Sequence, residues 1–91
     1  MRTLLLLSEK DSVFTCTTAV KKGDSLECDG VKISAANDIP IYHKIARTFV
    51  AKGSEVYKYG EAIGIASCDI HPGEHVHVHN VESARGRGDK R

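Results

Sequence analysis

Three copies of one short glycine-centred pattern constrain the fold of this chain more than any other feature of its sequence. Each copy has a β-branched residue, two further residues, a glycine, two more residues and an apolar residue, and the copies are 20–26, 50–56 and 70–76. A glycine at this spacing supplies the positive φ that a type II or related turn requires. In the third copy Pro72 precedes the glycine, at the turn position that its fixed φ already fits. Three such turns, each leading into a strand, predict a mostly β protein.

Short segments rich in β-branched and aromatic residues surround these turns and are the expected strands. They cover residues 3–7, 12–17, 25–28, 31–34, 43–48, 55–59, 63–68 and 74–79. The stretch 41–51 also fits a helix, because Ile41, Ile45 and Phe49 lie four residues apart. We favour a strand there, since the segment is short and a glycine turn follows it.

The chain length predicts one small domain, because 91 residues are too few for two separate cores. Residues 1–82 are expected to form that domain. Residues 83–91 hold four basic residues and no apolar side chain larger than alanine, which predicts a basic, flexible tail. The longest apolar run is four leucines at 4–7. A membrane helix needs roughly 20 apolar residues, and a secretory signal an apolar region of roughly 7–15. We therefore expect a cytoplasmic protein without a membrane partner.

Charge and cysteine content exclude further classes. The formal net charge is +1, and four of the 13 basic residues lie in the last seven positions, so the rest of the chain is weakly acidic. With no tryptophan and only five other aromatic residues, the chain offers few surfaces on which bases could stack, and no nucleic-acid partner is expected. Its three cysteines are odd in number and lack C-x-x-C spacing, which predicts reduced, buried thiols rather than a disulfide framework or a zinc knuckle.

Histidine is concentrated near the end of the chain, where His75, His77 and His79 alternate with valine. In a strand this alternation turns the valines toward the core and all three histidines to the other face. Residues on one face of a strand lie about 6.6 Å apart, so His75 and His79 would be about 13 Å apart. Without a bulge, one ion with ligand bonds of about 2.0–2.1 Å cannot reach all three. Two adjacent histidines could bind it together with His43, the candidate for a third ligand.

This pattern leaves two interpretations open: a metal or anion site, or a solvated strand face that is rich in imidazole. A neutral imidazole binds a metal and a protonated one binds a carboxylate, and the sequence does not separate these states. Lys44, Lys58 and Asn80 are weaker signals. Lys58 lies between two tyrosines in an expected edge strand, where lysine commonly prevents aggregation.

Three strings that occur in order carry a family resemblance: IPIYHKIA at 39–46, VYKYGEAIG at 56–64 and GEHVHVHNV at 73–81. They resemble the small N-terminal module of the altronate and galactarate dehydratase family, a SAF-type β-clip with short strands and tight glycine turns. The resemblance covers roughly residues 8–89 and extends to the small subunit of sulfolactate sulfo-lyase and, more distantly, to antifreeze-like domains. The chain departs from the family at Tyr42, where a glycine is common, and a bulky side chain there would reshape the pocket beside His43.

The resemblance implies dehydration of a sugar acid to a 2-keto-3-deoxy acid with a divalent metal, iron(II) or manganese(II). It suggests roles for the matched residues: His77, His79 and His75 as metal ligands, His43 and His77 as catalytic groups, and Lys44, Lys58 and Asn80 as substrate-binding groups. Such chemistry needs a base for the proton next to the carboxylate, a cation for the developing negative charge and an acid for the departing hydroxyl.

In this family the module accompanies a much larger catalytic part, either fused to it or as a separate subunit. The resemblance therefore implies the small subunit of a hydro-lyase, inactive without that large subunit. Two alternatives stay open: the small subunit of a sulfolactate sulfo-lyase, which eliminates sulfite instead of water, and a non-catalytic β-clip module that binds a metal or a carboxylate.

Overall fold

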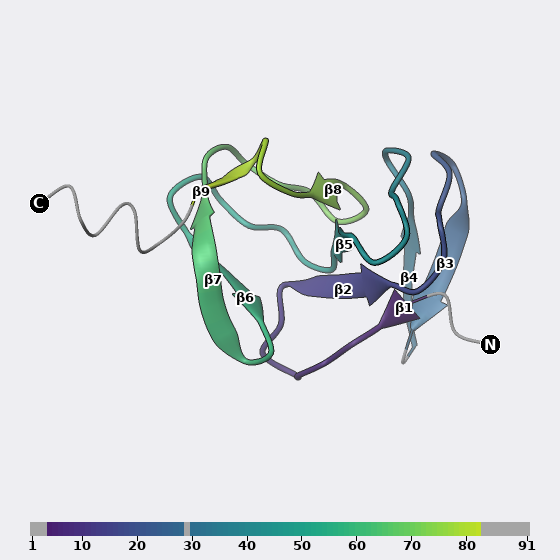
Figure 1. Ribbon diagram of the computed structural model, residues 1–91, viewed down its shortest axis with the longest axis horizontal. Helices are drawn as coiled ribbons and strands as arrows, with labels where there is room; N and C mark the ends of the chain where they lie inside the picture. Colours follow the sequence, from purple (N-terminus) through teal and green to yellow (C-terminus); the bar gives the residue numbers. More distant parts are fainter. Residues whose placement is uncertain (1–3, 29, 83–91) are drawn as a thin grey trace, which may run out of the picture.

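The computed structural model describes residues 4–28 and 30–82, and within them the protein is built from short strands (Figure 1). The described residues form no helix, so they contain none that could cross a membrane. The strands in this part of the chain are β1 (Leu4–Leu5), β2 (Val13–Cys16), β3 (Ser25–Cys28), β4 (Val31–Ser34), β5 (Lys44–Ala46), β6 (Glu55–Lys58), β7 (Glu61–Ala66), β8 (His75–Val76) and β9 (Val81–Glu82). The mostly β prediction is confirmed, and β5 rules out the helix considered for 41–51.

A four-stranded antiparallel sheet, in the order β1-β2-β5-β8, forms the centre of the molecule. The β3–β4 hairpin stands on one side of it, and the sheet β6-β7-β9 stands on the other (Figure 1). In the central sheet Ile45 of β5 pairs with His75 of β8. This pairing brings two segments that are distant in the sequence side by side, and it is the contact that assembles the site.

The central sheet is buried on both faces, because each face packs against a separate apolar cluster. Phe14 and Ile45, which pair across β2 and β5, face the first cluster. Val13 and Ala46, the next pair along, face the second cluster. Burying a large apolar side chain stabilises the fold by roughly 1.5–3 kcal/mol. The first cluster consists of Leu4, Phe14, Cys16, Val20, Cys28, Ala35, Ile39 and Ile45. The second consists of Val13, Ala46, Val50, Val56, Ala66, Ile70 and Val76.

The glycine turn occurs four times in the described structure, once more than the sequence pattern indicates. The three glycines of the pattern have positive φ angles: +93° at Gly23, +88° at Gly53 and +93° at Gly73. In the fourth turn Tyr42 occupies the glycine position with φ +69°, and the amide of His43 donates to the carbonyl of Pro40 at 3.1 Å. A left-handed backbone costs a residue with a side chain about 1–2 kcal/mol. The turn that delivers His43 to the sheet is therefore strained where the other three are relaxed.

Two isolated bridges, Val20 with Ile39 and Val50 with Ile70, mark two similar halves of the domain. In each half the chain leaves the first bridge residue, makes one turn and forms one long hairpin. It then returns to the second bridge residue and makes another turn. The hairpin is β3–β4 in the first half and β6–β7 in the second. Because of this repeat, the turns before β5 and β8 occupy equivalent positions and deliver histidines to paired strands.

The expected strands at 25–28 and 31–34 agree with β3 and β4, whereas the strand expected at 74–79 is shorter than predicted. Strand β8 ends at Val76, and residues 77–80 turn away from the sheet. Val76 is buried as predicted, but Val78 is 81% exposed, so its predicted place in the core is wrong. The sequence reasoning also missed β9. The tail predicted at 83–91 lies outside the described residues.

Candidate functional site

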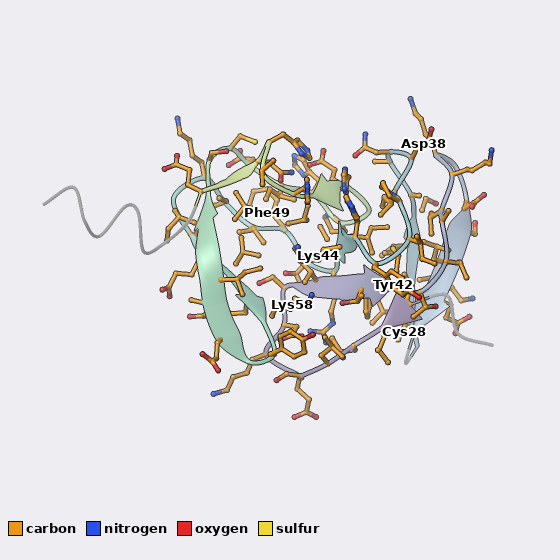
Figure 2. All side chains as sticks on the ribbon, viewed as in Figure 1. Cys28, Asp38, Tyr42, Lys44, Phe49 and Lys58 are labelled. Atoms are coloured by element: carbon orange, nitrogen blue, oxygen red, sulfur yellow. The ribbon has the colours of Figure 1, made fainter. Side chains whose placement is uncertain are left out.

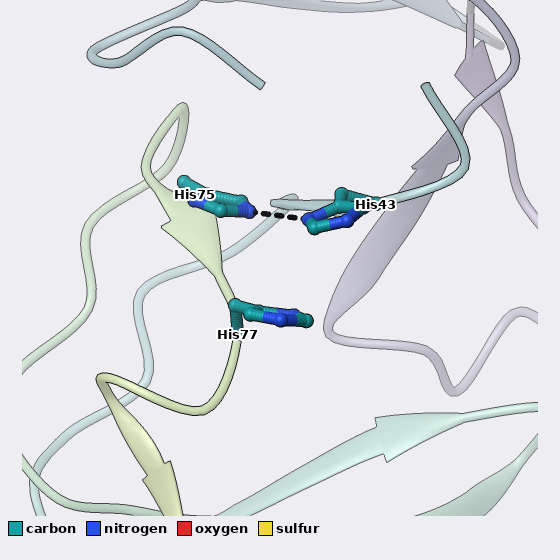
Figure 3. A group of neighbouring side chains, drawn as sticks. All are labelled: His43, His75 and His77. Carbon is teal, nitrogen blue, oxygen red and sulfur yellow. Dashed lines mark hydrogen bonds between the residues drawn. The ribbon is translucent and has the colours of Figure 1, made fainter. Parts of the chain in front are cut away.

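His43, His75 and His77 converge on one face of the central sheet and form the histidine trio (Figure 3). His43 ends the Tyr42 turn just before β5, His75 begins β8, and His77 follows it. The Nδ1 atom of His43 lies 2.9 Å from the Nε2 atom of His75. The ring of His77 stacks on His43 with 4.5 Å between centroids and lies almost parallel to His75, at 8°. The sequence had proposed these residues, and the β5–β8 pairing places them together.

A buried asparagine holds the segment that carries two of these histidines. Asn80 is 4% exposed, and its amide group donates to the carbonyl of His75 at 2.8 Å. Its side-chain oxygen accepts from the amide of His77 at 3.0 Å. Asn37, which the sequence reasoning missed, accepts from the amide of His75 at 3.0 Å. Both the oxygen and the amide group of the Asn80 side chain form hydrogen bonds with the main chain. This geometry is that of a positioning residue. The substrate contact expected of it stays a prediction.

His79 lies close to His75 but outside the histidine trio. The two rings are 5.3 Å apart between centroids, because the chain turns at 77–80 instead of continuing as a strand. The predicted separation of about 13 Å, which assumed an extended strand, is therefore wrong. His79 is exposed. The group whose ligand atoms lie within 4.8 Å of one another is His43, His75 and His77, so the geometry favours His43 over His79 as the third ligand.

The surroundings of His75 and His77 favour neutral imidazoles. Burial above all, and then the neighbouring His43, His79, His77 and Lys44, together lower the pKa of His75 to about 4. The pKa of His77 is also lowered, by burial first and then by His43 and Lys44. Groups with lowered pKa values stay unprotonated near pH 7 and keep a lone pair on one ring nitrogen. Imidazoles in this state are suited to bind a metal ion.

Three imidazole nitrogens form a donor set that fits a divalent transition metal. Two ligands bonded at about 2.0–2.1 Å to one ion can be at most about 4.2 Å apart, so small side-chain rotations suffice to close the trio on an ion. Nitrogen donors suit iron, zinc and copper, whereas manganese prefers oxygen ligands. Of the two metals that the resemblance implies, iron(II) fits the trio better.

Lys44 lies on the face of β5 opposite the histidine trio and borders the candidate site from that side. A depression of about 270 Å³ is lined by Lys44, Ile63, His77, Val78 and Val81. Ile63 is the unpaired residue of a β-bulge, because Val56 pairs with Gly64 and Tyr57 with Ala62. Bulges commonly redirect a side chain beside a site.

Lys58, the other lysine predicted to bind substrate, lies close enough to act on Lys44 (Figure 2). Burial lowers the pKa of Lys44, and the charge of Lys58 lowers it further. The Nζ atom of Lys58 lies 5.0 Å from the centroid of the Tyr59 ring. The structure thus places Lys44 beside His77 and Lys58 within electrostatic reach of Lys44.

The cysteines are not part of this site. Cys16 and Cys28 are buried as predicted, but Cys68 is exposed, so the prediction of a buried thiol is wrong for that residue. Burial raises the pKa of Cys16 to about 11, which keeps it as an unreactive thiol.

The comparisons of this chain with known proteins agree on one family. A family model described as the altronate/galactarate dehydratase SAF domain matches residues 2–84. The altronate dehydratase of Bacillus subtilis (strain 168) is 37% identical over 83 residues, which are 91% of this chain and 17% of that protein. The altronate dehydratase of Escherichia coli (strain K12) is 37% identical over 73 residues, 80% of this chain and 15% of that protein. The (2R)-sulfolactate sulfo-lyase subunit alpha of Paracoccus pantotrophus is 43% identical over 54 residues, 59% of this chain and 81% of that subunit.

The chain therefore spans about a sixth of the length of the altronate dehydratases it matches. The family match covers all of the residues that the structure describes. The resemblance seen in the sequence and the SAF-type fold are both confirmed by these findings. The chain belongs to the altronate/galactarate dehydratase SAF domain family.

Proposed function

We propose that this domain is the small, metal-binding component of an altronate-type sugar-acid dehydratase, which works in the cytoplasm together with a larger catalytic part. The observation that carries the proposal is the meeting of His43, His75 and His77 beside Lys44, within a domain of this family. The reaction is the elimination of water from a sugar acid to give a 2-keto-3-deoxy acid, which makes the complete enzyme a hydro-lyase.

The chain's own residues have separate tasks in this proposal. His43, His75 and His77 hold the metal, iron(II) by preference, and Asn80 fixes the segment that carries two of them. The ammonium group of Lys44 binds the carboxylate of the substrate in the depression beside His77. A bound divalent ion would stabilise the negative charge that develops when the proton next to the carboxylate is removed.

The base that removes this proton belongs, in our proposal, to the larger catalytic part. A ring nitrogen that binds a metal has no lone pair left to accept a proton, so His43 and His77 cannot be ligands and bases through the same nitrogen. The altronate dehydratases matched by this chain are about six times longer than the matched region, which leaves ample protein for the remaining catalytic groups. The domain alone is therefore expected to be inactive.

The test begins with recovery of the larger part from the native cell extract on the tagged 91-residue chain. The complex and the chain alone are then assayed on altronate and galactarate by the formation of the 2-keto-3-deoxy acid. We expect turnover by the complex and none by the chain. The variant His77→Ala should abolish turnover with the fold intact, and Lys52→Gln, in an exposed turn, should leave it unchanged. Turnover by the isolated chain, or a complex of His77→Ala that is as active as the wild type, contradicts the proposal.

A second candidate function is that of a sulfolactate sulfo-lyase small subunit. The observation in its favour is the coverage of the match, which extends over 81% of the Paracoccus subunit alpha. The two eliminations share removal of the proton next to a carboxylate and differ in the group that departs, water or sulfite. The same complex is therefore assayed on sulfolactate for sulfite release. Sulfite release without sugar-acid turnover would replace the first candidate by this one.

A further inference from the structure

The two similar halves of the domain have equivalent residues around their bridges. In the first half the main-chain amide of Lys22 donates to the carboxylate of Asp38 at 2.8 Å. In the second half the main-chain amide of Lys52 donates to the carboxylate of Asp69 at 2.9 Å. Each lysine lies two positions after the first bridge residue of its half, and each aspartate lies one position before the second. Residues next to the bridges can therefore be compared directly between the halves.

In the second half an aromatic side chain packs against the turn that leads to β8. Phe49 directly precedes the bridge residue Val50, and the centroid of its ring lies 5.1 Å from that of His71. The carbonyl of His71 accepts from the amide of Glu74 at 3.1 Å, so His71 is the first residue of this turn. The ring of Phe49 therefore braces, from within the chain, the turn that delivers His75.

The equivalent turn of the first half has no such ring. Ala19 occupies the position of Phe49, and Pro40 occupies that of His71. A depression of about 260 Å³, which we call the Ala19 groove, lies at this place and is lined by Ala19, Val20, Lys21, Asp38, Ile39 and Pro40. The carbonyl of Pro40 accepts from the amide of His43 at 3.1 Å. The unbraced turn is therefore the one that delivers His43 to the histidine trio.

The Ala19 groove has the size and the chemistry to receive one aromatic side chain. Pockets for drug-sized ligands begin at roughly 300 Å³, so about 260 Å³ suits a single side chain better. Val20 and Ile39 belong to the first apolar cluster and give the groove an apolar base. Lys21 favours a ring over an aliphatic group, because ammonium groups are attracted to aromatic faces. Aromatic side chains in such pockets commonly carry much of the binding energy of an interface.

We infer that the Ala19 groove receives an aromatic side chain of the larger catalytic part, and that this ring braces the turn of His43 as Phe49 braces the turn before β8. The choice of partner rests on the proposed function. The chain spans about a sixth of the altronate dehydratases that it matches, so the larger part has ample protein to present such a ring. The groove thus links assembly of the enzyme to the candidate metal site.

The link between groove and site is one short, strained turn. Tyr42 has a φ angle of +69°, a left-handed conformation that is unfavourable for a residue with a side chain. It lies between Pro40, which lines the groove, and His43, which belongs to the trio. A ring packed on Pro40 restricts the motion of this turn, so docking stabilises the placement of His43.

The first arm of the experiment supplies the missing ring from within the isolated 91-residue chain. Ala19→Phe introduces the residue type of the second half, and Ala51→Phe is the matched control at an exposed alanine beside the Gly53 turn. We expect Ala19→Phe to raise the urea midpoint and to give nuclear Overhauser contacts between the new ring and Pro40. Ala51→Phe should do neither. An unchanged or lower midpoint, or a ring without contacts to Pro40, means that the groove does not accept an aromatic side chain and overturns the inference.

The second arm measures by calorimetry the affinity of each variant for the larger catalytic part. In Ala19→Phe the groove is already filled, so we expect the affinity to fall by at least about tenfold, whereas Ala51→Phe should keep it. Unchanged affinity of Ala19→Phe overturns the inference and leaves the proposed function standing. Self-association of the wild-type chain that Ala19→Phe abolishes would make a second copy the occupant and also overturn it. A larger part that does not bind the wild-type chain removes both proposals. A complex that depends on the groove but turns over no sugar acid retains the docking site and removes the dehydratase role.

Discussion

The Nδ1 atom of His43 lies 2.9 Å from the Nε2 atom of His75, although the two residues are 32 positions apart in the chain. One of these nitrogens must carry a proton and the other a lone pair for the contact to be a hydrogen bond. The two rings are therefore coupled in the metal-free protein. An ion that binds both nitrogens must displace the shared proton to the other nitrogen of its ring, so metal binding and the tautomer of that ring are linked.

His43 should be essential for metal binding, and His79 should not. The variant His43→Ala removes the ligand that only the tertiary structure brings to the trio, and we expect the affinity for iron(II) to fall by at least about tenfold. Equilibrium dialysis under anaerobic conditions measures this. His79→Ala is the matched control, because it removes a nearby imidazole that is not part of the trio. If the two variants lose the same affinity, the assignment of the third ligand is wrong.

Asn80→Ala should weaken metal binding without removing a ligand. The substitution breaks two hydrogen bonds to the main chain of His75 and His77, so the two rings lose their fixed spacing. Residues that orient metal ligands typically change affinity by about 10–100-fold when they are mutated. The same dialysis assay applies, with circular dichroism to verify the fold. Unchanged affinity would show that Asn80 does not position the trio.

Tyr42→Gly should stabilise the protein by about 1 kcal/mol, because it relieves a left-handed backbone in a residue whose side chain is 71% exposed. Urea denaturation measures the change. The converse substitution Gly23→Ala, where an added Cβ meets no atom within 4 Å, should destabilise by a similar amount through the backbone alone. Gly73→Ala should cost more than Gly23→Ala, since its Cβ would overlap the carbonyl of Ser34. A destabilised Tyr42→Gly variant would mean that the tyrosine ring contributes more than the strain costs.

The stability of the metal-free protein should fall as the pH drops from about 6.5 to about 4. The pKa of His75 is lowered from 6.5 to about 4 in the folded state, so between these values the unfolded chain binds a proton that the folded chain does not. The free energy of unfolding therefore decreases with falling pH in this window, and the contribution of His75 is fully present above it. Urea midpoints in chelator at several pH values measure the trend.

The variant His75→Gln is the control for this pH dependence, because it keeps the carboxylates that also titrate at the acid end. Its midpoint should decline less than that of the wild type between pH 6.5 and pH 4. Parallel curves for the two proteins would exclude His75 as the source of the effect.

Cys68 should be the fast-reacting thiol of the folded chain. It is exposed, whereas Cys16 and Cys28 are buried, and burial raises the pKa of Cys16 to about 11. A thiol of high pKa is almost entirely protonated at pH 8 and reacts slowly. Titration with a disulfide reagent should show one rapid equivalent that disappears in Cys68→Ser, and urea should release the other two. Two or more rapid equivalents in the native protein would contradict the burial of the other thiols.

The glycine turns and the histidine cluster could be predicted from the sequence because both depend on local chemistry. A glycine at a fixed distance from a β-branched residue favours one turn, and its three copies set the mostly β architecture. The fourth copy escaped detection because Tyr42 stands where a glycine was expected, although the flanking Ile39 and Ile45 keep the spacing. A search for the spacing alone, without the glycine, would have found it.

The alternation of histidine and valine after His75 could not reveal where β8 ends. Its end is set by Asn80, which binds the main chain on both sides of Val76 and turns residues 77–80 away from the sheet. That turn leaves Val78 in solvent and moves His79 back beside His75. Local propensity favoured a longer strand, and a buried side-chain contact decided otherwise.

The sequence by itself determined the glycine turns, most of the short strands and the unusual number of imidazoles in this protein. Only the tertiary structure decided which of them meet. His43 joins His75 because β5 and β8 pair, and Lys44 and Lys58 approach each other because their strands share one core. Pairing between distant strands depends on the packing of both faces of the central sheet, and no single segment of the sequence contains that information.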